Sequence, residues 1–212
     1  MAEQTMTQET MDKKKNDLLT KYLSDMVGLE EHIYQAVDKQ VKGTEDEPTI
    51  NPFLRNVRDT LQEHVSALKA RLEELGGHPG NPIKEAGAAV LGMAAGLIDK
   101  LRAEEVSKNL RDDYTALSLS NISYVMLVTT SLACNDSQTA ELASRHLKDN
   151  AGFAMDIGKM IPDVVVKDLK DFTDLNEGAV EGAREAYSNA WDQGASQKSA
   201  SASPASSNGS SF

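Results

Sequence analysis

Two side chains that can bind a metal ion, Glu30 and His64, stand where two amphipathic helices should present apolar residues. Around Glu30 the apolar positions alternate in steps of four and three residues, at Leu19, Leu23, Met26, Ile33 and Val37. His64 interrupts a similar series, formed by Val57, Leu61, Leu68, Leu72 and Leu75. Because a buried carboxylate without a partner is unfavourable, such groups pair, change protonation or bind a metal. Two helices that each direct one ligand into a common core are typical of carboxylate-bridged di-metal bundles.

The elements that must position these side chains are helices. Apolar periodicity predicts four long ones, at Asn16–Val41, Phe53–Leu75, Asp112–Ala133 and Ser137–Ile161. Paired glycines end the second helix, and an acidic pair opens the third. Ser137 is the expected N-cap of the fourth, which should stop before a proline. The order of helix pair, crossover and helix pair predicts an all-α antiparallel four-helix bundle.

The crossover between the two helix pairs is a segment rich in small residues, Ile83–Val106. It has an apolar side and three glycines, which allow close approach of a neighbouring helix. We expect it to form one or two short helices. The Ala- and Gly-rich surface along Ala86–Leu101 predicts that the protein forms a homodimer.

Composition narrows the possible partners and location. The chain has 33 acidic and 22 basic residues and a formal net charge of -11, which is unlike a nucleic-acid-binding surface. It lacks an apolar N-terminal signal segment, and no apolar run approaches about 20 residues, so no membrane span is expected. A single cysteine fits a reducing compartment. We therefore expect a cytoplasmic protein that binds neither nucleic acid nor membrane.

The domain organisation follows from these segments. Residues 1–15 are expected to be a flexible N-terminal tail and residues 16–161 the helical bundle. Residues 162–191 contain two short helical patterns and form a C-terminal extension. Residues 192–212 are rich in Ser and Ala, and we expect them to be disordered.

Three stretches resemble the YciF/YciE-type ferritin-like stress protein family. They are LSDMVGLEEHIYQAV in the first helix, LQEHVSALKARLEELG in the second, and GMAAGLI at Gly92–Ile98 in the crossover. The similarity covers roughly Leu18 to Ile161. It implies a ferritin-like fold, in which Glu30 and His64 match metal ligands. It further implies iron or manganese and peroxide- or oxygen-linked chemistry.

Departures from the family pattern remove most of the other metal ligands. The carboxylate expected one turn after the histidine is Ala67, the third helix has Asn121-Ile122-Ser123-Tyr124, and the fourth has Asp149-Asn150. Neutral amides and phenols are poor ligands for hard divalent ions. We therefore favour a metal-free core network, in which the polar side chains satisfy one another: Glu30, His64, Asn121, Tyr124 and Asn150. A residual single-metal site is the alternative.

Two functions follow from these two interpretations. The first is a non-enzymatic, stress-associated ferritin-like protein that acts through self-association or partner binding and has no catalytic residues. The second is an iron- or manganese-binding oxidoreductase or metal-handling protein that uses Glu30 and His64. Its further ligands would be Glu63, Asp149 or His146. By periodicity His146 lies beside the apolar series of its helix and reaches the core only if that helix is rotated.

Overall fold

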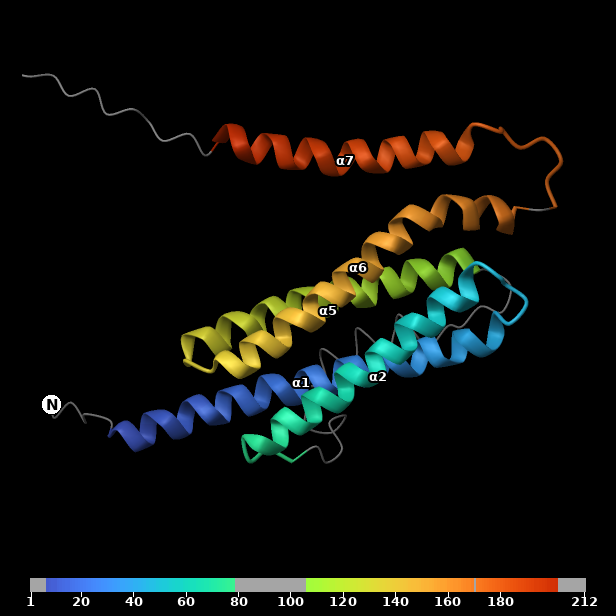
Figure 1. Ribbon diagram of the computed structural model, residues 1–212. Helices are drawn as coiled ribbons and strands as arrows, with labels where there is room; N and C mark the ends of the chain where they lie inside the picture. The colour runs from blue at the N-terminus through green and yellow to red at the C-terminus, as the bar shows by residue number, and fades with distance from the viewer. Residues whose placement is uncertain (1–6, 79–105, 170, 202–212) are drawn as a thin grey trace, which may run out of the picture. The chain divides into compact units, whose positions relative to one another are not determined.

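The computed structural model describes residues 7–78, 106–169 and 171–201, which contain helices and no strand (Figure 1). The all-α class is therefore confirmed for the described part of the chain. The helices, in chain order, are α1 (Gln8–Gly43), α2 (Ile50–Glu74), α5 (Val106–Ala133), α6 (Ser137–Asp168) and α7 (Ala179–Ser201). They belong to two compact units, one ending at Ile157 and the other beginning at Gly158. The predicted crossover helix lies outside the described residues.

Both ends of the described chain are more helical than the sequence predicts. Helix α1 begins at Gln8, within the segment expected to be flexible, because the Thr7 side chain accepts a hydrogen bond from the backbone N–H of Thr10. Helix α7 continues to Ser201, ten residues into the segment expected to be disordered. Residues 8–15, where the sequence indicated a flexible tail, and residues 192–201, where it indicated disorder, are thus helical in the structure.

The expected end of the fourth helix before Pro162 is also wrong. Helix α6 continues through this proline to Asp168. A proline inside a helix lacks one N–H donor and crowds the carbonyl group four residues earlier, which here belongs to Gly158. The missing hydrogen bond affects only one turn of α6, and the helical hydrogen bonds resume beyond that turn.

In the first unit the helices form two antiparallel pairs. Helix α1 packs against α2 and α5. The amide of Asn16 donates to the carbonyl of Leu75 over 2.8 Å at one end of α1, and Asn51 donates to the carbonyl of Val41 over 2.7 Å at the other. Helices α5 and α6 are joined by a tight turn at Cys134–Asp136. The two helix pairs enclose an apolar core.

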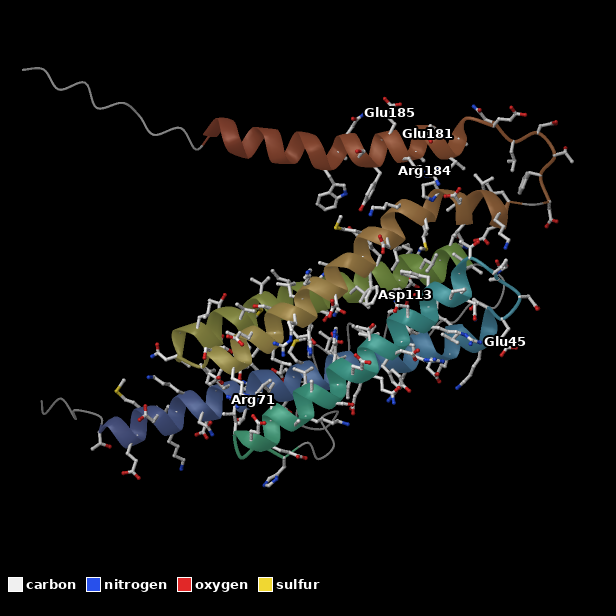
Figure 2. The ribbon with its side chains drawn as sticks, viewed as in Figure 1. Glu45, Arg71, Asp113, Glu181, Arg184 and Glu185 are labelled. Atoms are coloured by element: carbon white, nitrogen blue, oxygen red, sulfur yellow. The ribbon has the colours of Figure 1, made fainter. Side chains whose placement is uncertain are left out.

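Arg71 connects the end of α2 to the turn between α5 and α6 (Figure 2). Its guanidinium donates to both carboxylate oxygens of Asp136 at 2.9 Å and to the hydroxyl of Thr139 at 2.8 Å. Asp136 also accepts from the backbone N–H of Thr139 over 3.1 Å, so Asp136, and not Ser137, caps α6. This paired geometry fixes the register of the two helix pairs.

The second unit contains a close contact between α7 and the last turns of α6. Arg184 of α7 pairs with Asp163 over 2.5 Å (Figure 2). The hydroxyl of Tyr187 lies where a side chain on Gly158 would begin. The ring of Tyr187 contacts that of Trp191 edge to face, with centroids 6.2 Å apart. The missing side chain at Gly158 therefore makes room for Tyr187.

Replacing Gly158 with alanine should loosen α7. The new methyl group would overlap the Tyr187 ring, and overpacking of this kind typically costs about 1–3 kcal/mol. We expect faster amide hydrogen exchange throughout α7. Gly152→Ala is the matched control, because nothing lies within 4 Å of that position and alanine favours the helix by about 1 kcal/mol. If amide hydrogen exchange in α7 is the same in Gly158→Ala as in the wild type, the assigned contact between Gly158 and Tyr187 is wrong.

Candidate functional site

The carboxylate of Glu30 is fully buried at the centre of the first unit. Its Oε1 accepts hydrogen bonds from the hydroxyl of Ser120 over 2.5 Å and from the amide of Asn150 over 2.8 Å. Its Oε2 lies 3.3 Å from Nδ1 of His64. These partners come from α5, α6 and α2, so a single α1 carboxylate joins all four helices of the unit.

His64 lies between two carboxylates. Its Nδ1 faces Glu30, and its Nε2 lies 3.3 Å from Oδ2 of Asp149, whose side chain is half exposed. A neutral imidazole has one N–H and donates to only one of these groups. Both contacts are satisfied when the ring carries two hydrogens and a positive charge. The geometry therefore fits an imidazolium that balances the buried charge of Glu30.

A second histidine, His146, stacks on His64. The ring centroids are 3.8 Å apart and the planes are inclined by 14°. Burial, together with the nearby positive charges of His64 and Arg145, lowers the pKa of His146 to about 3. A neutral ring is the compatible partner for a stacked imidazolium, because two stacked cations would repel each other.

Tyr124 completes the site from α5. Its hydroxyl lies 3.0 Å from Nδ1 of His146. Burial raises the pKa of Tyr124 well above its usual value, and the charge and hydrogen bonding of Glu30 raise it further. The phenol is therefore neutral at physiological pH and provides one donor. It lies between a neutral histidine and a buried carboxylate.

The structure brings four of the five expected network residues together, namely Glu30, His64, Tyr124 and Asn150. The expected fifth, Asn121, is not in the network. Its buried Oδ1 has no hydrogen-bond partner among the described residues, and the neighbouring Ser120 occupies the position facing Glu30. Adjacent residues on a helix are about 100° apart around its axis, so Asn121 does not point in the direction of Ser120. The buried series of α5 (Asp113, Leu117, Ser120, Tyr124, Leu127, Ser131) identifies Ser120 by its three-and-four spacing.

His146 is buried, contrary to the expectation that it lies beside the core. The apolar spacing of the sequence predicts an inward series of Leu147, Asn150, Ala154, Ile157 and Ile161, of which Leu147 and Ile161 are only partly buried. The observed buried series is instead Ala143, His146, Asn150, Phe153 and Ile157. The helix is therefore rotated from the expected register. This rotation also brings Asp149 to His64, whereas Glu63 is exposed on α2.

The donor set does not fit a di-metal centre. Such a centre uses one Glu from each of two helices and a Glu-x-x-His motif from each of two others. Here both oxygens of Glu30 already face donors, and both nitrogens of His64 face carboxylates. The Oδ1 of Asn150 is buried without a partner in the described residues, but it supplies no charge. Within residues 7–78, 106–169 and 171–201, no group of three or more His, Cys, Asp and Glu side chains is placed to hold a metal ion.

A second buried polar pair lies nearer the start of α5. Asp113 is buried and accepts a hydrogen bond from the amide of Gln40 over 2.8 Å (Figure 2). The sequence indicated a helix-opening residue, but α5 begins seven residues earlier, at Val106. Burial raises the pKa of Asp113 to about 7, with a contribution from Asp112, whereas the Gln40 hydrogen bond lowers it. Two oxygens, Oδ2 of Asp113 and Oε1 of Gln40, lack partners among the described residues.

Fold and site together define an all-α protein whose helices enclose a charged polar cluster. A family model described as "Domain of unknown function (DUF892)" matches residues 14–170. The chain belongs to this family, which is ferritin-like. No curated protein and no solved structure matches the sequence significantly.

Replacing Tyr124 with phenylalanine should destabilise the first unit. The change leaves the buried Nδ1 of His146 without its hydrogen-bond partner. An unsatisfied buried polar group costs about 1–3 kcal/mol, and we expect a loss of this size in urea unfolding followed by circular dichroism. Tyr22→Phe is the control, because the partly exposed Tyr22 makes no hydrogen bond to another described residue. Equal stabilities of the two variants would rule out the assigned role of Tyr124.

Proposed function

We propose that this protein is a non-enzymatic ferritin-like four-helix bundle, related to the YciF/YciE-type stress proteins. In it an ion-paired network takes the place of most of a di-metal site. The single observation that carries the proposal is that the His64 ring lies between the carboxylates of Glu30 and Asp149, 3.3 Å from each. Hydrogen bonds to both carboxylates require a protonated ring, which gives the buried carboxylate a counter-charge from the chain itself. Such a bundle would act through self-association or partner binding.

Charge and composition support the remaining features of this proposal. The formal net charge of -11 is unfavourable for binding nucleic acid, whose backbone is itself negative. The same charge favours solubility, and the single cysteine fits the reducing cytoplasm. The proposal assigns the polar core a role in holding the four helices in one register. It assigns the interaction with partners to the surface.

A second candidate function is an iron- or manganese-binding oxidoreductase or metal-handling protein that uses Glu30 and His64. One observation favours it: Asp149, a second carboxylate, reaches the same histidine. His146 also lies in contact with His64. A single ion bound there would have to displace at least one of the present hydrogen bonds.

Metal content distinguishes the two functions. The untagged full-length chain is loaded with Fe(II) or Mn(II), desalted and analysed by inductively coupled plasma mass spectrometry. Much less than one metal ion per chain is the expected result. About one ion per chain would favour the second function, and about two would overturn the proposed one. A Glu30→Gln/His64→Gln chain serves as the control, because metal that it retains is bound elsewhere.

A further inference from the structure

The end of α6 and its connection to α7 carry large apolar side chains that are exposed to water. Four of them, at intervals of four, three and three residues, are between 37% and 65% exposed: Val165, Leu169, Phe172 and Leu175. We name these four residues the apolar stripe. The stripe begins on the last turn of α6 and continues into the connection (Figure 1). Connections of this kind are normally polar, so large apolar side chains gathered on one mark an interaction site.

The backbone keeps the first three residues of the apolar stripe on one side. The N–H of Leu169 donates to the carbonyl of Val165 over 3.2 Å, which adds one turn to the end of α6. The N–H of Phe172 donates to the carbonyl of Leu169 over 2.9 Å, and residues joined in this way lie above each other. Both ends of the connection are held, because Arg184 of α7 pairs with Asp163 of α6. The apolar stripe is therefore presented on a supported segment of the second unit.

Negative charge accompanies the apolar stripe. Residues 168–175 have the sequence DLKDFTDL, in which an aspartate immediately precedes each of the last three residues of the stripe. Lys170 is the one basic residue of this run. Asp171 and Asp174 are exposed, and neither forms an ion pair with another described residue. These two carboxylates are therefore available to pair with the cations of a partner.

We propose that the apolar stripe binds a cationic amphipathic helix of a partner protein. The proposal rests on the partner binding in the proposed function, and it names the surface and the chemistry of the partner. An amphipathic helix presents apolar side chains at intervals of three and four residues, which is the spacing of the stripe. Lysine or arginine side chains that flank the apolar face of such a helix would meet Asp171 and Asp174.

The charge of the segment argues against other occupants. Nucleic acid and anionic lipid are themselves negative and would be repelled. A second copy of this chain brings a formal net charge of -11, which is also unfavourable. A basic helix instead removes the apolar side chains from water and pairs with the carboxylates. The family match ends at residue 170, so Phe172 and Leu175 lie beyond the matched region.

A synthetic cationic helix tests the proposal. The probe is a fluorescently labelled peptide of leucine and lysine, in which the leucines form one face of a helix. A second peptide has glutamate in place of every lysine. Fluorescence anisotropy measures the binding of each peptide to the full chain. We expect saturable binding of the lysine peptide at micromolar concentrations and no binding of the glutamate peptide.

Two double variants separate the apolar and the charged contributions. Phe172→Ser/Leu175→Ser should raise the dissociation constant of the lysine peptide about tenfold or more, because it removes the largest apolar contacts. Asp171→Lys/Asp174→Lys should raise it by about the same factor, because like charges then face each other. The latter variant should also gain binding of the glutamate peptide, a result that misfolding does not produce.

The matched control is Glu63→Lys/Glu73→Lys, which changes the net charge by the same amount at two exposed positions of α2. It should bind the lysine peptide about as well as the wild type. An equal loss in the control and in Asp171→Lys/Asp174→Lys overturns the proposal, because general attraction between a basic peptide and an acidic chain then explains the binding. A wild-type chain that does not bind the lysine peptide also overturns it.

Two further measurements assign the remaining outcomes. Wild-type binding to phosphatidylcholine vesicles that is lost in Phe172→Ser/Leu175→Ser would assign the apolar stripe to lipid and overturn the proposal. Metal content, measured on the same samples, separates this proposal from the proposed function. A metal-free chain that does not bind the lysine peptide overturns only the helix-binding surface. A chain that binds the peptide and holds about two metal ions overturns only the proposed function.

Discussion

Replacing Asp113 with asparagine should stabilise the protein at about pH 8 by roughly 4 kcal/mol and have little effect at about pH 4. The size of this stabilisation follows from the pKa of Asp113, which is about 7 in the folded chain, whereas its ordinary value is 3.8. The folded state keeps a proton that the unfolded state loses. The contribution of Asp113 to the free energy of unfolding is therefore fully present below about pH 4 and is lost as the pH rises to about 7.

The partner of Asp113 explains why asparagine fits. The side-chain amide of Gln40 already donates to Oδ1 of Asp113, and its oxygen, Oε1, has no donor among the described residues. An asparagine would accept the same hydrogen bond and offer its own N–H to that oxygen. The protonated carboxyl group offers an O–H there, but the ionised form offers nothing.

Urea unfolding followed by circular dichroism, repeated from pH 4 to pH 8, measures the difference between this variant and the wild type. Glu63→Gln is the control, because it removes an exposed carboxylate and should give a small, nearly constant difference. A difference for Asp113→Asn that does not change with pH would show that the carboxyl group is already ionised at pH 4.

Replacing Glu30 with glutamine should cost about 3–5 kcal/mol, which is typical for a buried ion pair that loses one partner. The change leaves the imidazolium of His64 with the half-exposed Asp149 alone. The new amide group also brings an N–H donor close to Ser120 and Asn150, which are themselves donors to this position. The loss should appear as a lower denaturation midpoint at neutral pH.

A double-mutant cycle shows whether charge pairing causes that loss. His64→Gln alone leaves Glu30 as an uncompensated buried carboxylate and should be as harmful as Glu30→Gln. The Glu30→Gln/His64→Gln chain has neither charge, so it should lose clearly less than the sum of the single changes. Additive losses would argue against the ion pair. A neutral or stabilising effect of Glu30→Gln alone would mean that the carboxyl group is protonated.

Sequence periodicity predicted the helices and the main pair of the site, but not its full membership. Glu30 and His64 stand out because each interrupts a clear apolar series. Helix α5 is apolar on almost every side, so periodicity does not indicate which side faces the core and does not distinguish Asn121 from Ser120. On α6 the expected and observed series share Asn150 and Ile157 and differ by a small rotation, and only packing decides that His146 is buried.

The position of the aromatic residues affects how the unfolding of this protein is observed. Trp191 is the single tryptophan of the chain and lies on α7, in the unit that begins at Gly158. Its fluorescence therefore reports on that unit, whereas most of the described helical residues belong to the other. Transitions followed by emission and by helical ellipticity need not coincide. A single midpoint obtained from tryptophan emission would describe the minor unit and leave the polar core unobserved.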